Sequence, residues 1–116
     1  MSFVRTIWPT IIELPGFVRD VAGVLSEAEC MALGVYLAKQ PQCGDLIPGG
    51  KGLRKVRWTA RQKGKRGGAR VIYFYRMADE TIFLMAAYAK SEREDMTPDK
   101  KRELVEIAEA LATNGK

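Results

Sequence analysis

The sequence predicts an α+β fold, in which helices near the N-terminus and one C-terminal helix pack on a curved antiparallel sheet. Three observations lead to this prediction. The 116 residues suit one domain of ordinary size, and 47% of them are hydrophobic against 28% charged, as in soluble globular proteins. Segments with strand-like composition follow one another in the middle of the chain. Apolar residues at helical spacing precede and follow them, so we expect residues 1–116 to form a single domain.

The chain before residue 40 is predicted to hold one strand and two helices. Residues 5–13 are rich in β-branched and aromatic side chains, which favour a strand. Residues 17–25 carry apolar side chains at the spacing of a short helix. Ser26 and, three residues later, Glu29 form a capping-box pattern, which predicts a second helix over residues 26–39.

The middle of the chain is predicted to form an antiparallel meander. A loop rich in Pro and Gly, residues 40–52, leads to three strand-like segments at residues 53–58, 69–76 and 81–87. Successive short strands of this kind favour antiparallel pairing. Pro98 suits the first position of a final helix that reaches about residue 113, with an apolar stripe formed by Leu104, Ile107, Ala108 and Leu111.

The positive charge of the chain is concentrated in one stretch. Residues 49–76, which we call the basic segment, contain ten of the 19 Lys and Arg residues and no Asp or Glu. The remaining nine cations are outnumbered by 14 acidic residues, so the rest of the chain is acidic. Such a segment, with glycines and aromatic residues among its cations, favours a polyanionic partner and above all nucleic acid.

The available side chains limit the chemistry. The chain has no histidine, which excludes the usual imidazole acid and base of a metal-free ribonuclease. No cluster of Cys or carboxylate residues has the spacing of metal ligands, so we expect neither a metal nor a cofactor. Attack of an RNA 2′-hydroxyl on the adjacent phosphate needs no metal and no protein nucleophile. A lysine among clustered cations can act as the base, and arginine suits the charge of the transition state.

We expect the protein to be cytoplasmic. The apolar cluster at residues 7–14 is interrupted by Pro9 and Glu13, so it resembles neither a signal peptide nor a membrane span. Two cysteines, Cys30 and Cys43, are too few for a disulfide framework, so we expect free thiols in a reducing compartment.

Three runs of residues resemble the RelE/ParE superfamily of bacterial toxins, and within it the HigB-like toxins: LRKVRW at 53–58, GKRGGARVIYFY at 64–75 and AAYAKSEREDMTPDKK at 86–101. The resemblance spans roughly residues 11–111 and implies the small RelE-like α+β fold. It also implies ribosome-dependent cleavage of messenger RNA in the A site of the 70S ribosome. The partner that it implies is a HigA-like antitoxin with a helix-turn-helix domain.

The resemblance also implies a set of catalytic residues. Arg70 matches the family arginine that contacts the scissile phosphate. Lys55 and Arg57 match the paired cations of the preceding strand, which would position that phosphate. Lys90 occupies the basic position after the last strand, where it would aid proton transfer.

One family feature is missing from its usual place. Some RelE toxins carry a tyrosine in the C-terminal segment, as an acid or a stacking group, where this chain has Met96 and Thr97. Tyr73 and Tyr88 are the candidates for that role.

A second group of residues is expected to bind RNA or the ribosome. It comprises one strand arginine, the cations of the loop at residues 59–68 and one tyrosine, namely Arg54, Arg61, Lys63, Lys65, Arg66 and Tyr73. Of these, Lys65 would also help to position the phosphate. The alternative for each cation is a solvated strand face or loop, and the alternative for the tyrosine is the core.

Two other functions fit the same residues. A ParE-like toxin that binds DNA gyrase would share the fold, although it would not need a concentrated basic patch. A non-catalytic RNA-binding module would hold RNA through the basic segment without cutting it.

Overall fold

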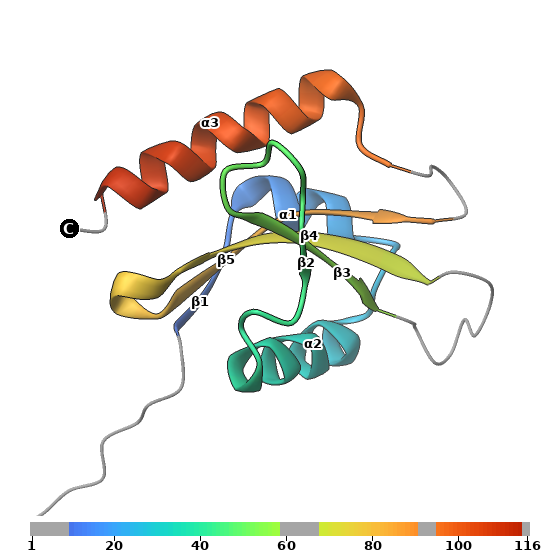
Figure 1. The fold of residues 1–116 in the computed structure, drawn as a ribbon. Coiled ribbons are helices and arrows are strands. Elements are labelled where there is room, and N and C mark those ends of the chain that lie inside the picture. The colour runs from blue at the N-terminus through green and yellow to red at the C-terminus, as the bar shows by residue number, and fades with distance from the viewer. Residues whose placement is uncertain (1–9, 59–67, 91–94, 115–116) are drawn as a thin grey trace, which may run out of the picture.

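A mixed sheet with the strand order β1-β5-β4-β3-β2 forms the centre of the structure (Figure 1). The computed structural model describes residues 10–58, 68–90 and 95–114. The strands in this part of the chain are β1 (Thr10–Glu13), β2 (Asp45–Leu46), β3 (Leu53–Trp58), β4 (Ala69–Arg76) and β5 (Thr81–Ala89). The helices are α1 (Pro15–Val21), α2 (Glu27–Lys39), the short 3-10 helix η1 (Met77–Asp79) and α3 (Pro98–Asn114). The predicted α+β class is therefore confirmed.

The three strands predicted as a meander pair as expected. Strands β3, β4 and β5 are antiparallel neighbours, and the bounds of β3 and β4 coincide with those predicted. Strand β1 pairs with β5 in parallel, so the sheet is not antiparallel throughout. The short strand β2 adds to β3 from a region predicted to be loop. The parallel pairing of β1 was not predicted because local residue patterns indicate a strand without specifying its partner. Strand β2 was not predicted because its two residues lie in a stretch rich in Pro and Gly.

The helices before the sheet begin and end at clear local signals. The Ser26 hydroxyl accepts a hydrogen bond from the Glu29 backbone N–H at 3.1 Å, and the Glu29 carboxylate accepts one from the Ser26 N–H at 2.7 Å. The predicted capping box therefore starts α2. Helix α1 ends at Val21, four residues earlier than predicted, because the chain turns at Gly23, whose φ of +84° is unfavourable for other residues.

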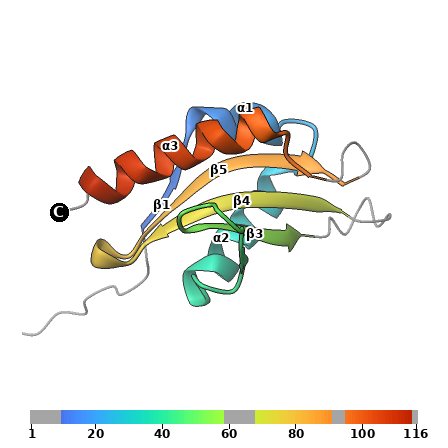
Figure 2. The same ribbon diagram turned by 45° about the horizontal axis from the view of Figure 1, so that its top comes forward.

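The helices α2 and α3 cover opposite faces of the sheet (Figures 1 and 2). The core on the α2 side contains Phe17, Leu25, Leu33, Leu37, Val56, Ala69, Val71, Tyr73, Ile82, Leu84 and Ala87. The core on the α3 side contains Leu53, Ile72, Phe74, Phe83, Met85, Ala86, Tyr88, Leu104 and Ala108. Each fully buried leucine contributes about 1.5–3 kcal/mol to folding, so both helices are held mainly by apolar burial.

The helix α1 lies along β5, beyond the point where β1 ends. One Asp20 carboxylate oxygen accepts a hydrogen bond from the Ala87 backbone N–H at 3.2 Å. In this way α1 covers an edge of β5 that would otherwise expose its backbone. The pairing of β5 with β4 shifts register between Ile72 and Tyr73, which makes Met85 the extra residue of a bulge.

Arg76 ties the far end of β4 to α3. Its guanidinium makes two hydrogen bonds to the Asp79 carboxylate, at 3.0 and 2.9 Å, and one to the Leu111 carbonyl at 2.8 Å. It also lies 4.9 Å from the centre of the Phe83 ring. This cation of the basic segment therefore has a structural role.

Candidate functional site

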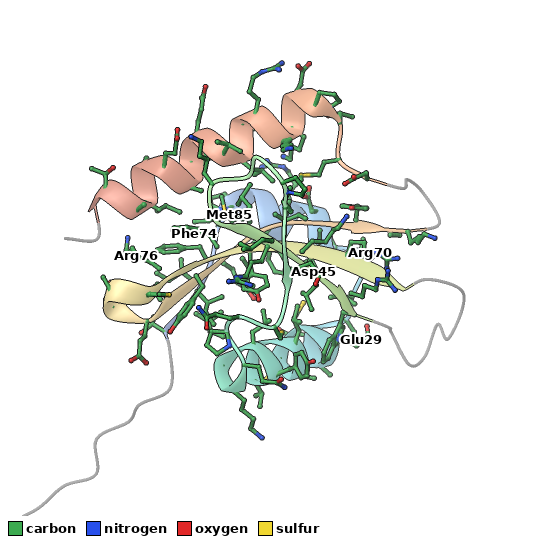
Figure 3. The ribbon with its side chains drawn as sticks, viewed as in Figure 1. Glu29, Asp45, Arg70, Phe74, Arg76 and Met85 are labelled. Atoms are coloured by element: carbon green, nitrogen blue, oxygen red, sulfur yellow. The ribbon has the colours of Figure 1, made fainter. Side chains whose placement is uncertain are left out.

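Three cations of β3 and β4, namely Lys55, Arg57 and Arg70, lie on the α3 side of the sheet. Alternation along β3 places Lys55 and Arg57 on the same side as Leu53, which belongs to the α3-side core. Arg70 likewise shares a side with Ile72 of that core and lies at the end of β4 opposite to Arg76 (Figure 3). We call the surface formed by Lys55, Arg57, Arg70, Tyr88 and Asp95 the basic face.

Two arginines face each other across neighbouring strands on this surface. Arg57 of β3 is directly opposite Arg70 of β4, and Arg70 is directly opposite Tyr88 of β5. Arg57 is exposed, whereas Arg70 keeps only 8% of its surface exposed. The Arg70 guanidinium also donates a hydrogen bond to the Ala69 carbonyl at 3.4 Å. Two guanidinium groups on one side of the sheet concentrate N–H donors and positive charge there, which suits a phosphate.

An acidic residue reaches the basic face from the segment before α3. One Asp95 carboxylate oxygen lies 3.7 Å from the Lys55 ammonium and 3.5 Å from the Tyr88 hydroxyl. The same oxygen accepts a hydrogen bond from the Met96 backbone N–H at 2.8 Å, which fixes its position. The sequence indicated only an acidic stretch here, so the contact between Asp95 and the basic face is a finding of the structure.

Lys90 lies at the same end of the sheet. It follows β5 directly, and its backbone N–H donates a hydrogen bond to the Gly68 carbonyl at 3.0 Å. Gly68 immediately precedes β4, which begins next to Arg70. Of the four residues predicted to be catalytic, three lie on the basic face and Lys90 lies beside it.

The groups at this site divide into phosphate ligands and proton carriers. Arginine stays protonated and offers a planar set of N–H donors, so Arg57 and Arg70 can bind phosphate oxygens but cannot act as bases. The Tyr88 hydroxyl can donate or accept a proton, and the Asp95 carboxylate can accept one. In the described part of the chain, no three His, Cys, Asp or Glu side chains gather as a metal-binding group.

Tyr73 does not have the predicted role in RNA binding. Its side chain is fully buried under α2, on the opposite side of β4 from Arg70. Its hydroxyl donates a hydrogen bond to the Pro41 carbonyl at 2.7 Å and accepts one from the Gly44 N–H at 2.9 Å. Burial raises the pKa of this hydroxyl well above its usual range. The prediction is wrong because an aromatic residue in a strand can face either side, and here it fills the core.

Arg54 also has a structural position. It points to the α2 side of β3, and its guanidinium donates hydrogen bonds to the Gln42 and Gly44 carbonyls at 3.0 and 2.8 Å. It therefore holds the loop before β2 in place and lies on the opposite side of the sheet from the basic face. The other residues predicted to contact RNA or the ribosome, Arg61, Lys63, Lys65 and Arg66, lie outside the described residues.

Comparisons with known proteins give a family match and a structural likeness. The chain matches the family described as "RelE toxin of RelE / RelB toxin-antitoxin system" over residues 36–116. Among solved structures, the chain resembles that of the E. coli toxin RelE. That structure is of a mutant with two arginine-to-alanine substitutions, in the free state. The TM-score is 0.55 and the identity 12%, over 76% of this chain and 90% of that chain. The structural likeness confirms the fold that the sequence predicted.

No helix in the described ranges is both long enough and apolar enough to cross a membrane. Both cysteines of the chain, Cys30 and Cys43, are free.

Proposed function

The chain belongs to the RelE family of type II toxin–antitoxin toxins, and on this premise we propose that it is a ribosome-dependent endoribonuclease. It would stop translation by cleaving messenger RNA in the A site. Its partners would be the 70S ribosome and an antitoxin with a HigA-like helix-turn-helix domain.

The like-charged pair of Arg57 and Arg70 is the observation that carries this proposal. The two residues lie directly opposite each other, with Lys55 on the same side of β3. A scissile phosphate bound beside them would be held by several charged N–H donors. In the transition state the phosphate gains charge, so these donors would stabilise it more strongly than the ground state.

The reaction needs only a base, an acid and phosphate ligands. The RNA 2′-hydroxyl loses its proton, its oxygen bonds to the adjacent phosphorus, and the bond from phosphorus to the 5′ oxygen breaks. The products are a 2′,3′-cyclic phosphate and a 5′-hydroxyl, which takes up a proton. Arg70 would stabilise the transition state, and Lys55 and Arg57 would position the phosphate.

Three residues would move the protons. Tyr88 lies opposite Arg70, and its hydroxyl contacts Asp95, so the pair would accept or supply a proton next to the phosphate. Lys90, at the end of β5, would assist the transfer to or from the leaving oxygen. The loop cations Arg61, Lys63, Lys65 and Arg66 would contact ribosomal RNA, with Lys65 also near the phosphate.

An assay on programmed ribosomes tests the proposal. The purified protein is incubated with 70S ribosomes that carry a defined messenger RNA, and with the same RNA alone. We expect cleavage within the A-site codon only when ribosomes are present, with 5′-hydroxyl and 2′,3′-cyclic phosphate ends. Intact RNA would contradict the proposal, and inhibition of gyrase supercoiling by the same preparation would favour the ParE-like alternative. RNA that is bound but intact would favour a binding module.

A further inference from the structure

The helix α2 carries apolar residues on its buried side and also on an exposed side. Leu33 and Leu37 are completely buried against the sheet. Met31 and Val35, on another side of the helix, are 70% and 52% exposed. A helix that is apolar on two sides usually packs against something on both. The outer side of α2 therefore lacks the polar surface expected of a helix facing only water.

These exposed residues line an open groove between α2 and β1. Its volume is about 750 Å³. Its walls are formed by Ile11, Glu13, Glu27, Cys30, Met31, Gly34, Val35, Ala38 and Leu84. The six α2 residues in this set follow one another at spacings of three or one, so they form a continuous stripe along the helix. We call this surface the α2–β1 groove.

Among the described residues, both charged side chains that line the groove are acidic. Glu13 and Glu27 line it, and one carboxylate oxygen of nearby Glu29 is buried without a hydrogen-bond partner. Burial together with Glu13, Glu29 and Glu27 raises the pKa of the Cys30 thiol. The thiol therefore stays protonated and apolar, and the groove has a negative potential although the chain carries a formal net charge of +5.

This combination specifies the chemistry of an occupant. An exposed apolar patch with charged residues at its rim is typical of a protein interaction site. An acidic rim favours a segment whose apolar side chains are flanked by Lys or Arg. A second copy of this chain paired symmetrically through the same groove would set two acidic rims against each other, which is unfavourable. The groove therefore suits a different protein better than a second copy.

We propose that the α2–β1 groove docks a segment of the cognate antitoxin that presents apolar side chains flanked by Lys or Arg. The proposal rests on the proposed function, in which an antitoxin is the physiological partner. The groove lies on the α2 side of the sheet and the basic face on the α3 side. An antitoxin held in the groove is thus anchored without competing with RNA for the docking site itself.

Titration calorimetry with the purified antitoxin encoded beside this chain's gene tests the proposal. In the double variant Met31→Glu and Val35→Glu, we expect antitoxin affinity to fall roughly 100-fold, because two apolar side chains at the centre of the groove are replaced by charged ones. The matched control is Val18→Glu with Leu46→Glu, since these residues are 51% and 59% exposed and lie outside the groove. The control should bind within about twofold of the wild type. Unchanged affinity in the groove variant, or an equal loss in the control, would overturn the proposal.

A second pair of variants tests the chemistry of the occupant. Gly34→Leu fills the groove without adding charge, and a side chain there begins in ordinary contact, 3.6 Å from the Ile11 Cδ1 atom. Glu13→Lys with Glu27→Lys reverses the acidic rim. We expect each to weaken antitoxin binding by about tenfold, the second more at low salt than at high salt. If neither affects antitoxin binding, the groove is not the docking site.

Two further readouts separate the possible failures. Ribosome-dependent cleavage by the groove variants should equal that of the wild type, and thermal melts show whether each variant is folded. Absence of cleavage in the wild type would defeat the proposed function while leaving the antitoxin result interpretable. If the wild type sediments as a dimer that the Met31 and Val35 changes dissociate, with antitoxin affinity unchanged, the occupant is a second copy and the proposal is wrong.

Discussion

The basic face and the α2–β1 groove lie on opposite sides of one sheet and are built in different ways. The basic face takes its residues from three neighbouring strands and from the segment before α3. The groove takes most of its residues from one side of a single helix. The first surface depends on strand register and the second on helical periodicity, so a change in one need not disturb the other.

The two surfaces also differ in chemistry. The basic face gathers the positive charges of Lys55, Arg57 and Arg70 on one side of the sheet. In the groove, Met31 and Val35 leave apolar surface in water. The first surface suits a phosphate and the second an apolar peptide. We therefore expect the molecule to bind RNA and antitoxin at separate places.

The largest expected effect concerns Arg70. We expect Arg70→Ala to reduce ribosome-dependent cleavage by roughly 100- to 1,000-fold, because one donor to the transition-state phosphate is removed. Antitoxin affinity should stay within twofold of the wild type. Arg102→Ala, which removes an exposed cation of α3 paired with Asp99, is the control and should leave both readouts unchanged. Full cleavage by Arg70→Ala would remove this residue from the site.

A smaller effect is expected from the exposed cations. The double variant Lys55→Ala and Arg57→Ala should bind programmed ribosomes about tenfold more weakly. The slope of log affinity against log salt should flatten by about 0.7 for each phosphate that is no longer neutralised. A matched double variant, Lys39→Ala with Arg102→Ala, removes two exposed cations elsewhere. If the two double variants have the same salt slope, the basic face does not touch phosphate.

The next effect concerns stability. Tyr73→Phe removes the hydroxyl that forms hydrogen bonds with Pro41 and Gly44. We expect the free energy of unfolding, measured in urea, to fall by about 1–3 kcal/mol. Cleavage and antitoxin binding per folded molecule should not change, because Tyr73 belongs to neither surface.

The same variant has a pH signature. Because the pKa of Tyr73 is raised in the folded protein, the unfolded chain ionises first, near pH 10. The stabilisation is therefore present below about pH 10 and is lost as the pH rises above it. The free energy of unfolding of Tyr73→Phe should fall less steeply with pH than that of the wild type over this alkaline range. Parallel curves of unfolding free energy against pH would contradict the assignment.

The smallest effect is expected at Asp95. Asp95→Asn keeps an oxygen for the Met96 N–H but removes a negative charge 3.7 Å from Lys55. Exposed ion pairs are worth about 0.2–1 kcal/mol, so we expect RNA affinity to rise two- to threefold. Cleavage would fall despite tighter binding if Asp95 also accepts a proton. Weaker binding by this variant would mean that Asp95 positions Lys55 and does not oppose the phosphate.

Sequence reasoning worked best where the signal is local. The capping box at Ser26 and the bounds of β3 and β4 depend on residues a few positions apart, and all were correct. The α+β class followed from the order of these elements. Strand β2 was missed because its two residues lie in a Pro- and Gly-rich stretch and pair only through contact with β3.

The candidate site was predicted less completely than the fold. Lys55, Arg57 and Arg70 were grouped by the family resemblance, and the structure places all three on one side of the sheet. Their catalytic roles stay a prediction. Asp95 was missed, since nothing in its neighbours shows that it meets a residue 40 positions earlier. The apolar residues on the outer side of α2 could be seen in the sequence. The sequence does not show, however, which apolar side of a helix is buried and which is exposed.

By itself, the sequence determined most of the elements, the basic segment and the family resemblance, because each depends on the order of residues along the chain. Only the tertiary structure decided how that positive charge is used. It assigned Lys51 to an ion pair with Glu109, Arg54 to the loop before β2 and Arg76 to α3, and it left Lys55, Arg57 and Arg70 on the basic face. The physical reason is that a charged side chain acts on the groups nearest to it in space, and those are chosen by the packing of distant segments.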